Sequence, residues 1–131
     1  MSNIFGFLIL SLTACGSSDD SGKDTTNISS NGCHMVTTTD ESSDMEVYMD
    51  FSPEDLTISV GDCVQFVMSD THNAIEVSEE NYTNRDSTAL DGGFQVQYGE
   101  TVEVTFDEAG THYYVCQPHI TMDMIGTITV E

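Results

Sequence analysis

The fold is decided by residues 98–130, which read YGETVEVTFDEAGTHYYVCQPHITMDMIGTITV. Apolar and polar residues alternate there in three runs, and a period of two is typical of half-buried β-strands. The runs are 102–106, 111–117 and 124–130. The first run follows Gly99-Glu100 and the second follows Ala109-Gly110, which are turn residues. The stretch therefore predicts three consecutive strands joined by short connections.

Similar short runs occur upstream, at 34–39, 45–51, 56–60, 64–68, 73–78 and 94–98. Together the runs predict eight or nine strands at the spacing expected of an antiparallel β-sandwich or barrel. Residues 79–93 interrupt this rhythm and predict a long crossover loop with one helical turn around 88–91. We therefore expect an all-β domain with one long excursion.

The chain has 131 residues, which is enough for one small domain. Its 23 acidic residues against 2 basic ones give a formal net charge of -21. Phosphate backbones and anionic headgroups repel such a charge, which argues against binding to nucleic acid and against docking on a membrane through a basic patch. A charged partner protein should be basic at the contact.

The N-terminal residues carry a targeting pattern. Residues 4–12 form an apolar segment of signal-peptide length, and Leu12-Thr13-Ala14-Cys15 resembles the lipobox of bacterial lipoproteins. This resemblance implies that residues 1–14 are a lipoprotein signal peptide and that the thiol of Cys15 is lipidated. The alternative is an ordinary secretory signal in which Cys15 is incidental. Both alternatives place the folded part outside the cytoplasm, in the periplasm or at the cell surface, where disulfides persist.

Residues 15–32 predict a lipid-anchored flexible linker. Ile28 is the one apolar residue in 16–32, and such a segment buries too little surface to offset its ordering entropy. A coil of this length spans about 20 to 25 Å. No apolar run reaches the roughly 18 residues that a membrane-spanning helix needs, so the lipid is the expected membrane contact. The remaining residues, 33–131, form the predicted domain.

The residues that bear chemistry gather near the C-terminus. A thiol at Cys116, an imidazole at His119 and a thioether at Met124 belong to one loop, and His72 ends another predicted strand. Two His, one Cys and a distant Met suit copper that alternates between Cu(I) and Cu(II). Zinc is the alternative metal, but zinc sites usually bring several Cys or His and no Met. Met122 competes with Met124 for the axial position.

Several stretches are similar to the plastocyanin and pseudoazurin branch of the cupredoxins. They are residues 98–106, 109–119 and 124–130, with LTISVGDCVQF at 56–66 and Thr71-His72-Asn73. The resemblance covers nearly all of 34–131, and its most specific part is the motif Cys-x-Pro-His-x4-Met-x-Gly. It implies a Greek-key β-sandwich, one type 1 copper ion, one-electron transfer and no enzymatic activity.

The resemblance also implies a role for each site residue. The copper ligands would be His72, Cys116, His119 and Met124, with Met124 the weak axial one. Asn73 resembles the residue whose backbone N–H reaches the Cys sulfur and whose side chain ties the two ligand loops together. Pro118 has no N–H, so it leaves that sulfur with fewer hydrogen bonds. The imidazole of His119 is expected at the surface as the electron's exit, within an apolar contact patch made of Pro118, Ile120, Ala74 and Met122.

Cys33 and Cys63 each lie at the start of a predicted strand. In the cupredoxin fold the first strand runs alongside the one that Gly61-Asp62 opens, so the resemblance makes a disulfide between them reasonable, although it departs from the usual plastocyanin pattern. The alternative is a second soft-metal cluster formed by Cys33-His34-Met35 together with some of Met45, Met49 and Met68.

The charge and the resemblance together indicate the partners. Glu76, Glu79 and Glu80 follow the first ligand, where plastocyanins carry part of an acidic docking patch, but acid spread over the whole domain is equally compatible with a solubilising surface. Val115 stands where plastocyanins place a surface Tyr, so His119 is the expected single electron port. We expect a monomer whose partners are redox proteins with a basic contact surface, such as a c-type cytochrome or an oxidase or reductase.

Three functions remain open at this level. The first is a membrane-tethered one-electron shuttle, which requires a buried thiolate beside an exposed His ligand. The second is extracytoplasmic copper sequestration or delivery, which the 7 Met residues favour. The third is a metal-free structural sandwich joined by Cys33 and Cys63.

Overall fold

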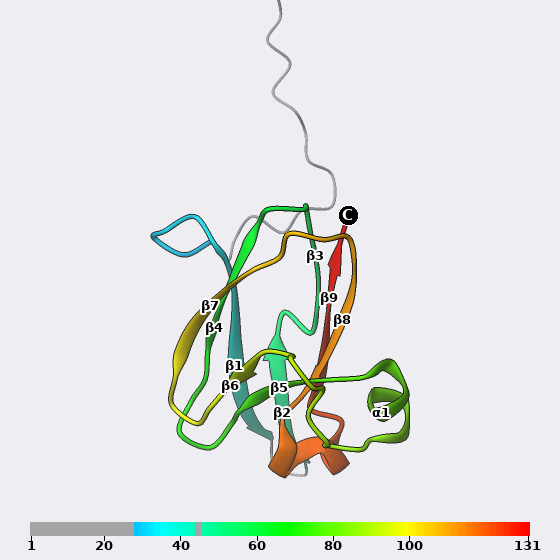
Figure 1. The fold of residues 1–131 in the computed structure, drawn as a ribbon. Coiled ribbons are helices and arrows are strands. Elements are labelled where there is room, and N and C mark those ends of the chain that lie inside the picture. The colour runs from blue at the N-terminus through cyan, green and yellow to red at the C-terminus, as the bar shows by residue number, and fades with distance from the viewer. Residues whose placement is uncertain (1–27, 44–45) are drawn as a thin grey trace, which may run out of the picture.

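The computed structural model describes residues 28–43 and 46–131, and for residues 41–48 this description excludes the side chains. The predicted signal peptide (1–14), Cys15 and most of the predicted linker lie outside the described residues. The described part contains nine strands in two sheets that form a sandwich (Figure 1), which confirms the all-β prediction. Within this part of the chain no helix is long and apolar enough to cross a membrane.

One sheet has four strands in the order β2-β1-β4-β7. Its strands are β1 (His34–Ser43), β2 (Glu46–Ser52), β4 (Cys63–Val67) and β7 (Thr101–Thr105). The other sheet has five strands in the order β3-β9-β8-β5-β6. Its strands are β3 (Asp55–Ile58), β5 (Ala74–Val77), β6 (Gln95–Val96), β8 (Gly110–Val115) and β9 (Ile125–Val130).

Both sheets are mixed rather than purely antiparallel. β1 runs parallel to β4, with Val36 opposite Phe66, and β3 runs parallel to β9, with Leu56 opposite Ile128. The remaining strand pairs in the described part are antiparallel. The alternation of apolar residues fixes which face of a strand is buried but not the direction of its neighbour, so the sequence pattern did not reveal the parallel pairs.

The excursion between β5 and β6 contains a short helix, α1 (Glu79–Asn84), on the outside of the five-stranded sheet (Figure 1). The Ser78 side chain accepts a hydrogen bond from the Asn81 N–H and so caps the first turn. The helical turn expected at 88–91 is wrong, because residues 86–90 have no regular structure. The Thr88 backbone N–H and hydroxyl instead both donate to the Asp86 carboxylate.

The core lies between the two sheets and is rich in aromatic rings. The Tyr114 ring is fully buried, and its centroid lies 4.8 Å from that of Phe51 and 5.5 Å from that of Phe66. Cys116 and Met124 belong to the same buried cluster. Two residues of the predicted metal loop are thus built into the main hydrophobic core, and burial in a packed core limits how far they move.

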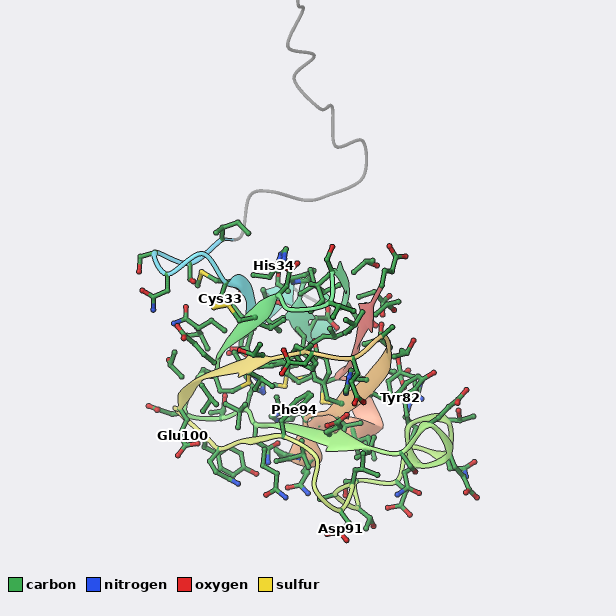
Figure 2. All side chains as sticks on the ribbon, turned by 45° about the horizontal axis from the view of Figure 1, so that its top comes forward. Cys33, His34, Tyr82, Asp91, Phe94 and Glu100 are labelled. Carbon is green, nitrogen blue, oxygen red and sulfur yellow. A yellow bond between two sulfur atoms is a disulfide. The ribbon has the colours of Figure 1, made fainter. Side chains whose placement is uncertain are left out.

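A disulfide joins Cys33, just before β1, to Cys63 at the start of β4 (Figure 2). The parallel register places His34 opposite Val64, so the two cysteines come next to each other. This excludes the second soft-metal cluster, because the thiol of Cys33 is consumed and the Nε2 atom of His34 lies 3.1 Å from the Asp62 carboxylate.

The folded part begins slightly before Cys33. Ile28 forms a β-bridge with His34, and the buried Ser29 accepts a hydrogen bond from the Cys33 N–H on its side-chain oxygen. Residues 28–32, which the sequence assigned to the linker, therefore pack against the sandwich where β1 begins.

Replacing both Cys33 and Cys63 by Ala should lower the free energy of unfolding by roughly 3 to 4 kcal/mol, because the disulfide restricts the unfolded chain. Urea unfolding followed by circular dichroism measures the loss. Wild-type protein under reducing conditions is the matched control and should unfold at the same midpoint as the double variant. A double variant as stable as the oxidised wild type would contradict the prediction.

Candidate metal centre

The candidate ligands lie where strands of the five-stranded sheet end. His72 comes just before β5, Cys116 directly follows β8, and Met124 directly precedes β9. β8 is hydrogen-bonded to both neighbours, and its last residue, Val115, lies opposite Ile75 of β5 and Ile125 of β9. This register brings the three strand ends together at the end of the sandwich where the 3-10 helix η1 (Gln117–Met122) lies, opposite the C-terminus (Figure 1).

Three ligand atoms converge at this point. The Cys116 Sγ atom lies 3.6 Å from the His72 Nδ1 atom and 3.4 Å from the His119 Nδ1 atom, and the two Nδ1 atoms are 3.0 Å apart. His72 and Cys116 are fully buried, whereas His119 is partly exposed. A metal ion with bonds of about 2.0 to 2.3 Å in a trigonal plane needs edges of about 3.5 to 3.8 Å, so the triangle is within about half an ångström of the required size.

Met124 is held against this triangle by its backbone. Its carbonyl accepts a hydrogen bond from the Cys116 N–H, and its own N–H donates to the His119 carbonyl. The Met124 side chain is fully buried in the cluster that includes Cys116, whereas Met122 is 44% exposed. Of the two candidate axial residues, only Met124 has a side chain in the interior.

Asn73 connects the two ligand-bearing loops, as the sequence predicted. Its side-chain oxygen accepts from the Gln117 N–H at 2.9 Å, and its side-chain amide donates to Gln117 Oε1 at 3.0 Å. Burial raises the pKa of the Cys116 thiol, and backbone hydrogen bonds from Asn73 and His119 act in the opposite direction. The Asn73 donor agrees with the resemblance, whereas the His119 donor was not anticipated from the sequence.

One further residue at the site escaped the sequence analysis. The outer ring nitrogen of His72, Nε2, lies 2.5 Å from the Asp40 carboxylate on β1. Asp40 is 32 positions away in the chain, and no motif connects it to the ligand loop. Its one sequence signal is the shared parity with Val36 on β1, which places the acid on the same strand face as a core residue.

The surface around His119 differs from the predicted apolar patch. Pro118 and Met122 are exposed as expected. Ala74 and Ile120 are buried, so their inclusion in the patch is wrong. Ala74 begins β5 and joins the main core, and Ile120 packs against Val115 under η1. Burial lowers the pKa of His119, the neighbouring His72 lowers it further, and the Asp40 carboxylate opposes both.

Comparison with known proteins agrees with this geometry. Residues 36–131 match the family described as copper binding proteins, plastocyanin/azurin family. The chain belongs to this family. It is 34% identical over 84 residues to a plastocyanin from Scenedesmus fuscus, covering 62% of this chain and 86% of that protein. It is 36% identical over 84 residues to a plastocyanin from Prochlorothrix hollandica, covering 62% of this chain and 63% of the relative.

The solved structures lead to the same family. A pseudoazurin from Sinorhizobium superposes with a TM-score of 0.56 at 30% identity, covering 74% of this chain and 72% of that one. The chain is accordingly a type 1 copper electron-transfer protein rather than an enzyme, and His72, Cys116 and His119 form its candidate ligand group.

The structure changes the account of the acidic residues near the first ligand of this cupredoxin. Glu76 is buried, accepts from the Phe94 N–H, and lies 2.6 Å from the His112 Nδ1 atom. It therefore belongs to the interior rather than to an acidic docking patch. Glu79 and Glu80, on α1, are exposed.

Val115 is fully buried in a small apolar cluster with Ile120 and Ile125, against which Tyr82 of α1 packs. The position before Cys116 is therefore covered in this cupredoxin. The interpretation of His119 as the electron port gains support, because Val115 offers no exposed group beside Cys116.

Arg85 attaches α1 to the ligand loop of the cupredoxin. It ends the helix in the left-handed conformation, donates from Nε to the Asp123 carboxylate at 2.7 Å, and donates from Nη1 to the Tyr82 carbonyl. The Gln117 side chain adds a hydrogen bond to the Ser87 carbonyl. Residues from the excursion thus brace both ends of the loop that contains His119.

Proposed function

We propose that residues 33–131 form a cupredoxin domain that carries one electron at a time outside the cytoplasm, through a single copper ion bound by His72, Cys116, His119 and Met124. The observation that carries this proposal is the convergence of one thiol and two imidazole nitrogens within 4.8 Å. Bound copper supplies the one-electron step, because thiolate and thioether favour Cu(I) and imidazole serves both states.

The protein contributes a rigid ligand set. Cys116 and Met124 are linked by a backbone hydrogen bond of 3.0 Å, and Asn73 fastens the His72 loop to Gln117 through two more. A ligand set that is fixed by its own backbone changes little when the charge of the metal changes. Small reorganisation favours rapid electron transfer over storage.

The number of sites also favours a carrier over copper sequestration. Among the described residues, one group of His, Cys and acidic side chains has the spacing of a metal site, and it is His72, Cys116 and His119. The Met residues that suggested storage are divided, since Met68 and Met124 are buried in the core and Met122 is exposed. We therefore expect one copper per chain.

His119 is the proposed electron port, because its ring joins the triangle while remaining partly exposed between Pro118 and Met122. The partner would be a redox protein with a basic contact surface, such as a c-type cytochrome or an oxidase or reductase. The net charge of -21 supports this choice, since opposite charges accelerate the encounter and help to orient it.

Loading wild-type protein with Cu(II) should give an intense visible thiolate-to-copper charge-transfer band. Cys116→Ser should abolish it, because this substitution removes the thiolate from which the charge is transferred. Visible absorption with copper quantification checks both the band and the ratio of one copper per chain. The Cys33→Ala/Cys63→Ala variant is the matched control and should keep the band. A colourless Cu(II) form of the wild type would defeat the proposed function.

Met124→Leu should raise the reduction potential, because the axial thioether tunes the potential of such sites. Leu is similar to Met in size but has no atom that can coordinate the metal. Met122→Leu is the matched control and should leave the potential unchanged, since the Met122 side chain lies at the surface. Spectroelectrochemical titration measures both. The assignment of Met124 as axial ligand fails if the Met122 variant shifts and the Met124 variant does not.

We further propose that the domain is tethered through a lipid on Cys15. The support is the lipobox-like Leu12-Thr13-Ala14-Cys15 and the polar segment that follows it. A linker of this composition gives the domain a reach of about 20 to 25 Å from the membrane surface.

Expressed in a bacterium that processes lipoproteins, the chain should be found in the membrane fraction and should begin at a lipidated Cys15. Cys15→Ala should release the domain into the soluble extracytoplasmic fraction without loss of the visible band. Fractionation and intact-mass analysis check this. A wild-type mature chain that starts elsewhere and carries no lipid would refute the anchor.

A further inference from the structure

Asp40 occupies a position that continues the core-facing side of β1. Val36 and Asp40 point to the same face because side chains alternate along a strand, and Val36 is fully buried. Across the hairpin Asp40 lies opposite Met49, which packs against the main core. The Asp40 carboxylate itself remains half exposed, so the buried group in this contact is its partner.

The partner is the buried ligand His72. The last parallel pair between β1 and β4 is Thr37 with Val67, so β1 continues beyond the end of β4 alongside the connection that contains His72. The Asp40 Oδ1 atom lies 2.5 Å from the His72 Nε2 atom, and the His72 side chain has no exposed surface. The Asp40 side chain is 51% exposed, so water reaches the carboxylate but not the ring.

This contact settles which ring nitrogen of His72 carries the proton. An ionised carboxylate only accepts hydrogen bonds, so Nε2 must be the donor. In the neutral ring the lone pair then resides on Nδ1, which faces the Cys116 sulfur and the His119 ring. The ring is thereby fixed in the tautomer and orientation that a metal at the triangle requires.

We propose that Asp40 is a positioning residue that fixes the ring of His72 for copper and biases the bound ion toward its oxidised state. This inference rests on the proposed function, because it concerns the same copper ion. A carboxylate that accepts the His72 proton increases the basicity of the ring, and its negative charge stabilises Cu(II) more than Cu(I).

The charge of Asp40 reaches the whole site. Besides the larger effect of burial, it raises the pKa of Cys116, and it acts on His119 in the direction opposite to burial. The half-exposed carboxylate is partly screened by solvent, so its effect is smaller than that of a buried ion pair at the same distance.

The test compares three variants of the copper-loaded protein. Asp40→Asn removes the charge but keeps an oxygen that accepts the His72 proton. Asp40→Ala removes both the charge and the acceptor. Asp50→Asn is the matched control, since Asp50 on β2 lies opposite Thr39 and so points to the other face of the same hairpin while losing the same charge.

The expected results separate charge from positioning. In Asp40→Asn the ratio of oxidised to reduced protein at a fixed ambient potential should fall about tenfold. For a one-electron couple this corresponds to a rise of about 59 mV in the reduction potential. Asp40→Ala should show at least the same rise and should also bind Cu(II) about 10- to 100-fold more weakly. Asp50→Asn should show a clearly smaller rise and unchanged affinity.

A second readout does not depend on the potential. In the reduced, diamagnetic protein, the His72 Nε2–H should appear in nitrogen-correlated NMR spectra as a slowly exchanging proton in wild type and Asp50→Asn, and should be lost to exchange in Asp40→Ala. Equal potential shifts in Asp40→Asn and Asp50→Asn would overturn the inference, as would a proton unaffected by Asp40→Ala.

Failure of the proposed function is distinguishable from failure of this inference. A wild type without the visible band defeats the proposed function and, with it, the bias on copper. In that event the His72 Nε2–H resonance of the metal-free protein still tests the contact between Asp40 and His72. This resonance should change in Asp40→Ala and remain in Asp50→Asn.

Discussion

The hydrogen-bonded register of β5, β8 and β9 is the constraint on which the rest of the structure depends. Val115 pairs with both Ile75 and Ile125, Cys116 and Met124 lie immediately beyond these pairs, and His72 lies shortly before Ile75. A slip of one residue in either ladder would turn Cys116 or Met124 away from the core and toward the opposite face. The candidate metal centre is therefore a property of the sheet as much as of its loops, because the folded sheet brings its thiol and imidazole groups together.

Much of this arrangement was predictable from the sequence for physical reasons. Alternation located the strands because one face of each lies against a single core, and the spacing of Cys116, His119 and Met124 located the loop of the candidate metal centre. The direction of β1 and β3 was not predictable, since alternation is the same in parallel and antiparallel pairs. α1 was missed because none of its six residues is fully buried and only Tyr82 packs against an apolar cluster, so the sequence shows no apolar stripe there.

The errors at the site have a common origin, which is contact between residues distant in the sequence. Ala74 and Ile120 flank the ligands in the chain, but packing buries them, and Glu76 turns inward to meet His112. Asp40 was missed for the converse reason, because β1 overruns β4 and so reaches the outer side of His72. The sequence motif identifies the residues whose atoms face the candidate metal position. The length of β1 determines that Asp40 contacts the outer side of His72.

The described chain begins beside the Cys33–Cys63 disulfide, where Ile28 bridges to His34, and η1, which contains His119, lies at the other end of the sandwich (Figure 1). The proposed lipid tether would attach the domain at the disulfide end of the sandwich and leave the η1 end pointing away from the membrane. Rotation of the domain about its linker would then keep the imidazole of His119 in the aqueous phase. Encounters with soluble redox proteins would be favoured over encounters with proteins embedded in the same membrane.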